Sequence, residues 1–157
     1  MREWFGKDQT LNREIMMAKR LNRDEAKLHL VYLVAKSDFK SGGWFGIGEG
    51  DLITDEEEKY LQTVIQEENL KLDWPVFLDQ MGDWVDDEEE LWAKACKVMK
   101  RASKSERLET IKLMGGMANA SREDDKKNNI SDIEWDLMIR TSKELDVYNE
   151  YMDWVRN

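Results

Sequence analysis

The sequence predicts an all-α fold: a single-domain helical bundle of about seven to eight helices built from two similar halves. Its 157 residues are 41% hydrophobic, which is enough for one domain, residues 1–157, with a substantial core. The chain has one proline and is rich in residues that favour helix, and no run of alternating β-branched residues is long enough for a sheet. An apolar helix, a loop and a capped helix follow one another in residues 28–70 and again in residues 108–147, which predicts the two halves.

The second helix of each predicted half begins with the same residue pattern. Thr54 stands three residues before Glu57, and Ser131 stands three residues before Glu134. At that spacing the hydroxyl and the carboxylate each accept a hydrogen bond from the other residue's backbone N–H, an arrangement called a capping box. We therefore expect one helix to begin after Thr54 and another to begin after Ser131.

Residues 10–21 form the first predicted helix, which is amphipathic and basic. Its apolar side chains, such as Leu11 and Ile15, lie on one side and its basic side chains on the other. Such a helix can lie on an anionic membrane or dock on an acidic body. Because the rest of the chain is acidic, docking is the preferred interpretation, and peripheral membrane contact through residues 1–21 stays open.

The second helix is the predicted centre of the bundle. Asn22 and Glu25 have the spacing of a capping box, and residues 28–35 are apolar nearly all round. His29 lies inside this apolar run and is the single histidine of the chain, so a metal site with two histidine ligands is excluded. We expect His29 to have a packing or surface role.

Residues 37–53 form the longest predicted loop, which is rich in glycine. Trp44 and Phe45 lie among the glycines, and Glu49 and Asp51 follow. Long loops without secondary structure of their own are often functional. We expect Trp44 and Phe45 to contact a protein partner, and the alternative is that both rings fold under and fill the core.

Two known loop motifs do not fit this segment. No strand precedes the glycines and no Gly-Lys-Ser/Thr ends them, so a phosphate-binding loop is excluded. An EF-hand that started at Asp38 would place Lys40 at position three and Gly42 at position five, where oxygen ligands belong. An ordinary EF-hand is therefore rejected.

The remaining expected helices follow the loop. They cover residues 55–68 and 74–81, the segment from the acidic run 86–90 to Ala102, the segment from Ser103 to Ala118, and residues 132–145 and 148–156. Pro75 suits the first turn of the helix at 74–81. The acids at 86–90 precede a helix whose other end is basic, as the helix dipole favours, so a structural role is preferred to a metal cluster.

Two features of the later helices predict packing. Cys96 is expected to pack as a small hydrophobic residue beside the apolar face of its helix. Gly115 and Gly116 each cost roughly 1 kcal/mol in a helix interior, which predicts that another helix, with the second helix as the expected partner, crosses closely there. The acids of the loop at 119–129 are mixed with bases, so a solvated loop and a second ion site both stay open.

Charge and cysteine content narrow the function classes. A formal net charge of −10 argues against binding to nucleic acid phosphates, which needs clustered Lys and Arg. With Cys96 as the single cysteine, no intramolecular disulfide can form. Residues 1–6 lack the apolar core of a signal peptide, and no segment approaches the roughly 18 apolar residues that span a bilayer. We therefore expect a cytoplasmic protein.

Two short motifs lead into helices headed by acids. They are Leu33-Val34-Ala35-Lys36-Ser37-Asp38 followed by Thr54-Asp55-Glu56-Glu57 in the first half, and Ile130-Ser131-Asp132-Ile133-Glu134 in the second. Over residues 24–150, the chain resembles the TerB-like family of tellurite-resistance and phage-resistance proteins. The resemblance implies a helical fold of two similar halves and a role in stress response or phage defence, without an established enzymatic activity.

The resemblance also implies a divalent cation, Ca²⁺ or Mg²⁺, held by acids around the loops. The implied ligands are Asp38, Asp55 and Glu57 in the first half and Asp132 and Glu134 in the second, and Glu49 and Asp51 join them if the long loop folds back. The two glutamates also belong to the expected capping boxes, so their two roles compete.

Three functions stay open. The first is a noncatalytic helical adaptor that binds a protein partner through Trp44 and Phe45. The alternatives are a calcium sensor and an acidic inhibitor that mimics nucleic acid. An enzyme is disfavoured, because metal-carboxylate catalysis in helical bundles uses Glu-x-x-His pairs and Ala26 stands where that glutamate would precede His29.

Overall fold

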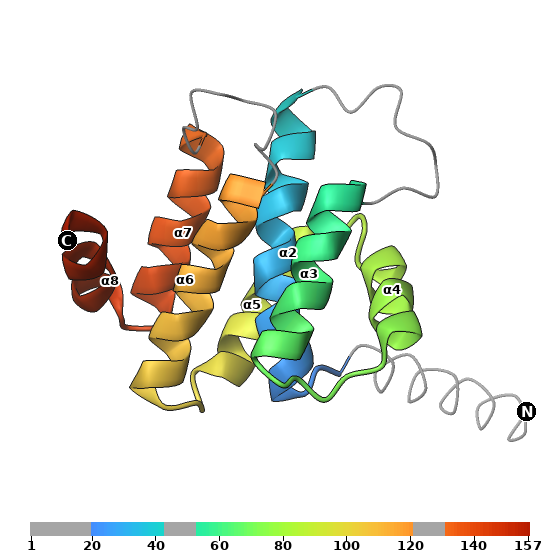
Figure 1. Ribbon diagram of the computed structural model, residues 1–157, viewed down its shortest axis with the longest axis horizontal. Helices are drawn as coiled ribbons and strands as arrows, with labels where there is room; N and C mark the ends of the chain where they lie inside the picture. Colours follow the sequence, from blue (N-terminus) through green and yellow to red (C-terminus); the bar gives the residue numbers. More distant parts are fainter. Residues whose placement is uncertain (1–19, 43–52, 121–130) are drawn as a thin grey trace, which may run out of the picture.

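A computed structural model describes residues 20–42, 53–120 and 131–157, and every regular element in these ranges is a helix (Figure 1). In chain order the helices are α2 (Arg23–Gly42), α3 (Asp55–Glu67), α4 (Trp74–Asp83), α5 (Glu88–Met99), α6 (Lys104–Ala120), α7 (Asp132–Glu144) and α8 (Tyr148–Arg156). The all-α prediction is confirmed. The first predicted helix, residues 10–21, lies outside the described residues except for its last two.

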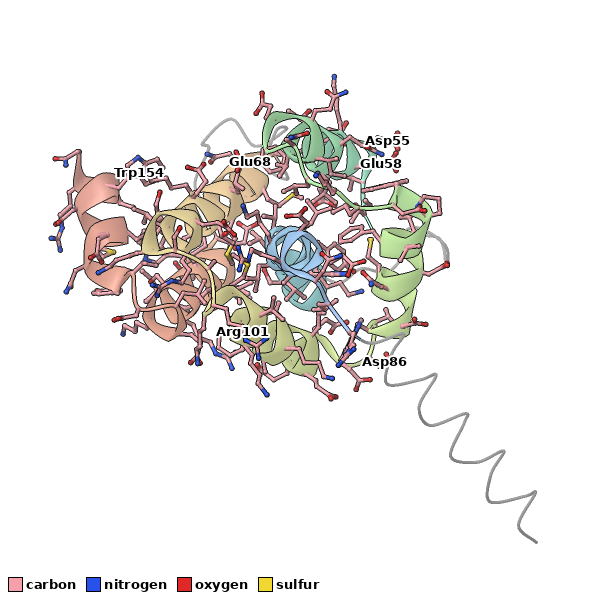
Figure 2. The ribbon with its side chains drawn as sticks, turned by 90° about the horizontal axis from the view of Figure 1, so that it is seen from below. Asp55, Glu58, Glu68, Asp86, Arg101 and Trp154 are labelled. Atoms are coloured by element: carbon pink, nitrogen blue, oxygen red, sulfur yellow. The ribbon has the colours of Figure 1, made fainter. Side chains whose placement is uncertain are left out.

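Helix α2 is the centre of the bundle, as its sequence predicts. It packs against α3, α5, α6 and α7, and Figure 2, which looks nearly along its axis, shows the other helices around it. Side chains from Ala26 to Ala35 are buried, including those of Lys27 and His29. A helix that is apolar nearly all round can bury its side chains from water only by packing against neighbours on every side.

The end of α2 differs from the prediction. The helix continues to Gly42, so the segment from Ser37 to Gly42 is helical and Asp38 lies within a helix rather than in a loop. The Ser37 hydroxyl donates a hydrogen bond to the Val34 carbonyl oxygen at 2.7 Å. This bond is compatible with a helix, so the serine does not end it as its turn preference suggests.

The capping boxes predicted at the second helix of each half are both present. At the start of α3, the Thr54 N–H donates to Glu57 Oε1 at 2.8 Å, and the Glu57 N–H donates to Thr54 Oγ1 at 3.2 Å. At the start of α7, the Ser131 N–H donates to Glu134 Oε1 at 3.0 Å, and the Glu134 N–H donates to Ser131 Oγ at 3.1 Å. The hydrophobic residue that precedes Ser131 lies outside the described part of the chain.

Helices α3 and α7 also end in the same way. Asn69 and Asp146 adopt positive φ angles of 53° and 57°, the left-handed conformation that closes many helices. One residue further on, the N–H of Leu70 donates to the Ile65 carbonyl and the N–H of Val147 donates to the Ser142 carbonyl, both at 2.9 Å. These matching ends support the interpretation as two similar halves, which stays a prediction.

Gly115 and Gly116 allow close packing, but their neighbours are not those predicted. A Cβ atom on Gly116 would lie 2.0 Å from the hydroxyl oxygen of Tyr60 on α3. A Cβ atom on Gly115 would lie 3.8 Å from Met138 Sδ and 3.9 Å from the Tyr151 hydroxyl, on α7 and α8. Helix α2 packs on α6 too, but the nearest groups at the glycines belong to α3, α7 and α8.

The two shortest helices, α4 and α8, lie on opposite sides of the bundle (Figure 1). Helix α4 packs against α2 through aromatic rings, with the centroids of His29 and Phe77 4.3 Å apart. Helix α8 packs against α6 and α7, and the rings of Trp135 and Tyr151 are 6.2 Å apart. In the described ranges, no helix has the length and apolar character needed to cross a membrane.

Candidate functional site

The predicted cation ligands that the structure describes do not come together. Asp55 and Asp132 are exposed at the first positions of α3 and α7, whereas Glu57 and Glu134 are buried and accept the backbone hydrogen bonds of their capping boxes. Within the described ranges, no three His, Cys, Asp or Glu side chains are grouped so that they could hold a metal ion.

Several other predicted site residues lie outside the described residues. These are Glu49, Asp51, Trp44 and Phe45, together with the acids of the predicted loop at 119–129, and the side chain of Asp38 is not described either. Cation binding and the partner contact through the long loop therefore stay predictions.

His29 takes part in a buried chain of hydrogen bonds between α2 and α4. Its Nε2 lies 2.8 Å from Gln80 Oε1, and Gln80 Nε2 donates to Glu25 Oε2 at 3.2 Å. Glu25 Oε1 in turn accepts from the Asn22 N–H at 3.0 Å, in the predicted capping box of α2. Because Gln80 Oε1 can only accept, His29 carries its proton on Nε2.

The environment of His29 keeps it neutral. The side chain is fully buried, and this burial lowers the pKa of the imidazole to about 4, against a smaller opposing effect of the Gln80 hydrogen bond. Nδ1 has no hydrogen-bond partner in the described part of the chain. The predicted packing role is confirmed.

Cys96 is a buried residue of α5. Burial raises the pKa of its thiol to about 12, with a further contribution from the negative charge of Glu144. A thiol with this pKa is protonated at neutral pH and is a poor nucleophile. The prediction that Cys96 packs as a small hydrophobic residue is confirmed.

The sequence did not indicate a pocket that opens between α2, α5 and α7. Its volume is about 140 Å³. Leu33, Trp92 and Leu137 form apolar walls, and the polar lining consists of Lys36, Ser37, Glu88, Glu89 and Arg140. We call this hollow the α2–α5–α7 pocket. Its lining comes from three helices that are far apart in the sequence, so no local motif could have revealed it.

Arg140 is a charged group of the α2–α5–α7 pocket that contacts both an aromatic ring and a carboxylate. Its guanidinium carbon lies 3.9 Å from the centroid of the Trp92 ring. Its Nη1 donates to Glu89 Oε1 at 2.9 Å, its Nη2 lies 2.7 Å from Glu89 Oε2, and the hydrogen bond to Glu89 raises the pKa of the guanidinium. A planar guanidinium that both stacks and pairs in this way has little freedom left.

Two hydrogen bonds hold the Trp92 ring in place. Its Nε1–H donates to Thr141 Oγ1 at 2.9 Å, and the Thr141 hydroxyl donates to the Leu137 carbonyl oxygen at 2.7 Å. Both polar groups are buried. The ring therefore holds one position, and Arg140 rests on it.

A second, more open hollow lies between the start of α3 and the end of α6. Its volume is about 730 Å³, and its lining is Asp55, Glu56, Lys59, Tyr60, Thr63, Gly116, Asn119 and Ala120. Asp55 and Glu56 are its acidic residues, and Thr63 and Asn119 add neutral side-chain oxygen atoms.

Exposed apolar side chains lie on α4, α7 and α8. They are Val76, Leu78, Ile133, Trp154 and Val155. Trp154 is 49% exposed and lies at the edge of the molecule in Figure 2. Its ring stacks on Tyr151 with 6.0 Å between centroids, and Lys112 Nζ lies 5.1 Å from the ring centroid.

Comparison with known proteins assigns no relative to the chain. No family model matches it, and no curated protein and no solved structure gives a match.

Proposed function

We propose that the chain is a noncatalytic helical adaptor that binds a protein partner. The resemblance to the TerB-like family in short motifs supports a place in a stress-response or phage-defence system. The single observation that carries the proposal is the exposure of Trp154, a large apolar ring held in a fixed position on the surface.

The state of His29 and Cys96 supports a noncatalytic role. A nucleophilic mechanism of the cysteine type needs a thiolate beside a general base. Here the thiol of Cys96 has a pKa of about 12, and His29 is enclosed among α2 and α4 side chains with a pKa near 4. The two residues are used in packing instead.

The surroundings of Trp154 suit a binding residue. Tryptophan is enriched among the residues that contribute most to protein–protein affinity. Stacking on Tyr151 and the contact with Lys112 already restrict the ring, so a partner would lose little affinity to ordering it. The partner that fits is a protein surface with an apolar recess for the indole ring and an acidic group that can approach Lys112.

A capture experiment with matched variants tests the adaptor proposal. The full chain, Trp154→Ala and the control Val76→Ala are immobilised and exposed to extract of the native cells, and their melting temperatures are compared. We expect a protein that the unmodified chain and Val76→Ala retain to be lost with Trp154→Ala at an unchanged melting temperature. Equal capture by all three would contradict the role of Trp154.

The double variant Trp44→Ala/Phe45→Ala belongs in the same experiment. If it loses the partner while Trp154→Ala keeps it, the adaptor function stands but its contact surface is the predicted loop rather than α8. If no variant and no unmodified chain retains a protein, the adaptor proposal fails.

A divalent cation is the second part of the proposal. In Figure 1 the starts of α3 and α7 and the ends of α2 and α6 lie at the same end of the bundle. Asp55 and Asp132 are exposed at this end. Among the described residues these acids are not grouped into a site, so the proposal rests on their shared end of the bundle and on the TerB-like resemblance, and ion titration tests it.

A further inference from the structure

We infer that the α2–α5–α7 pocket binds a small zwitterion, specifically a free α-amino acid with a short apolar side chain. The inference goes beyond the adaptor proposal and does not depend on it. It rests on the volume of the pocket, on the two signs of charge along its lining and on its three apolar walls.

Arg140 supplies the recognition of a carboxylate. The guanidinium has five N–H donors, and Glu89 engages two of its nitrogens. Three of the five N–H groups are not used by these two contacts, so a ligand carboxylate can bind without breaking the pair with Glu89. The stacking on Trp92 holds the guanidinium in place before the ligand arrives, and Lys36 adds a second positive charge to the lining.

Acceptors for an ammonium group line the same pocket. Glu88 and Glu89 belong to the first turn of α5, and a carboxylate can accept several hydrogen bonds at once. Glu89 can therefore accept from an ammonium while it holds Arg140. The Ser37 hydroxyl donates its proton to Val34, so its oxygen remains able to accept.

The charge balance selects a zwitterion over a singly charged ligand. Two acidic and two basic side chains line the pocket. The two glutamates would therefore repel a simple anion, and Lys36 and Arg140 would repel a simple cation. A ligand that carries both charges on adjacent groups can pair each of them. A peptide end carries one of these charges, which favours the free amino acid.

Size and wall chemistry limit the side chain of the ligand. The pocket holds about 140 Å³, and a cavity of roughly 150 Å³ accepts a molecule of about six heavy atoms such as benzene. The opening to solvent leaves room for slightly more. Leu33, Trp92 and Leu137 would contact a short aliphatic side chain, so alanine and valine are the expected ligands.

Titration of the full chain with L-valine and its blocked forms tests the inference. Calorimetry measures affinity, and the indole N–H resonance of Trp92, assigned with Trp92→Phe, reports the site. We expect saturable binding of L-valine with a shift of that resonance, and at least about tenfold weaker binding of N-acetyl-L-valine, which lacks the ammonium, and of L-valinamide, which lacks the carboxylate.

Variants separate the pocket from the rest of the surface. Arg140→Ala should weaken L-valine binding at least about tenfold. Lys104→Ala is the control, because it removes a comparable exposed ion pair, with Glu150, on α6 and α8, and it should bind as the unmodified chain does. Should Arg140→Ala fail to fold, the comparison of L-valine with its blocked forms on the unmodified chain still decides.

Three results would overturn the inference. They are the absence of saturable L-valine binding up to about 10 mM, where a ligand with a millimolar Kd would nearly saturate, equal binding of the blocked forms, and undiminished binding by folded Arg140→Ala. Loss of partner capture by Trp154→Ala has no bearing on any of them, so this inference and the adaptor proposal fail separately.

Discussion

The hydroxyl of Tyr60 lies in the space that a side chain on Gly116 would occupy. A Cβ atom at position 116 would stand 2.0 Å from this oxygen and 2.8 Å from the ring carbon that bears it. The same hydroxyl donates a hydrogen bond to the Leu113 carbonyl oxygen at 2.8 Å. Tyr60 therefore joins α3 to α6 in two ways. Its ring packs where Gly116 has no side chain, and its hydroxyl binds a backbone carbonyl of α6.

Gly116→Ala should destabilise the protein. Overpacking costs typically about 1–3 kcal/mol, and the better helix propensity of alanine returns up to about 1 kcal/mol, so we expect a net loss of about 1–2 kcal/mol in urea unfolding. Gly115→Ala is the matched control, since its Cβ meets only ordinary contacts at 3.8 and 3.9 Å. Equal stability of the two variants would show that Tyr60 can move away freely.

His29 should make stability depend on pH below neutrality. Its pKa is about 4 in the folded protein, against the ordinary value of 6.5, so the unfolded chain binds more protons between these values. The free energy of unfolding that depends on neutral His29 is fully present above pH 6.5. It is lost as the pH falls towards about 4, by an amount on the order of 3 kcal/mol.

The measurement compares the free energy of unfolding of the unmodified chain and His29→Leu from pH 7 to pH 4. Carboxylates contribute equally to both proteins, so the difference isolates the histidine. We expect the unmodified chain to lose more stability than His29→Leu over this range. Parallel curves would mean that the imidazole is protonated without cost inside the fold.

Removing a capping hydroxyl should weaken each helix start by a similar amount. Thr54→Ala and Ser131→Ala should each cost about 1 kcal/mol in denaturant unfolding, because one backbone N–H loses its acceptor. The sites lie on different helices, so the double variant should show the sum of the two losses. Asp136→Asn serves as the control, since this exposed acid lies beyond the first turn of α7 and is not part of a box.

The cation proposal predicts a thermal shift. Calcium or magnesium at millimolar concentration should raise the melting temperature of the unmodified chain, because a ligand that binds only the folded state stabilises it. The double variant Asp55→Asn/Asp132→Asn should lose this response, whereas Asp136→Asn, an exposed acid later in α7, should keep it. An unchanged melting temperature with either ion would reject the proposal.

Local sequence patterns predicted the local structure well. The capping boxes depend on residues three positions apart, so Thr54 with Glu57 and Ser131 with Glu134 could be recognised without knowing the fold. The burial of α2 followed from an apolar surface that no single neighbour could cover. The predicted end of α2 was wrong, because serine and glycine only weaken a helix and do not stop it.

Contacts between distant segments could not be predicted in the same way. The cost of glycine inside a helix predicted a close neighbour at Gly116 but not that Tyr60 would be that neighbour. Arg140 and Trp92 each look like ordinary helix residues in the sequence, and only the packing of α5 against α7 stacks them. The α2–α5–α7 pocket depends on such packing, so it could not be predicted from the sequence.

The central position of α2 limits how the chain can be divided. Because α2 packs against α3, α5, α6 and α7, a fragment that ends before α6 would expose one side of α2 to water, and a fragment that begins at α6 would lack its main apolar neighbour. Neither piece should fold alone. Mixed together, the two pieces should reassemble, since each supplies the surface that the other is missing.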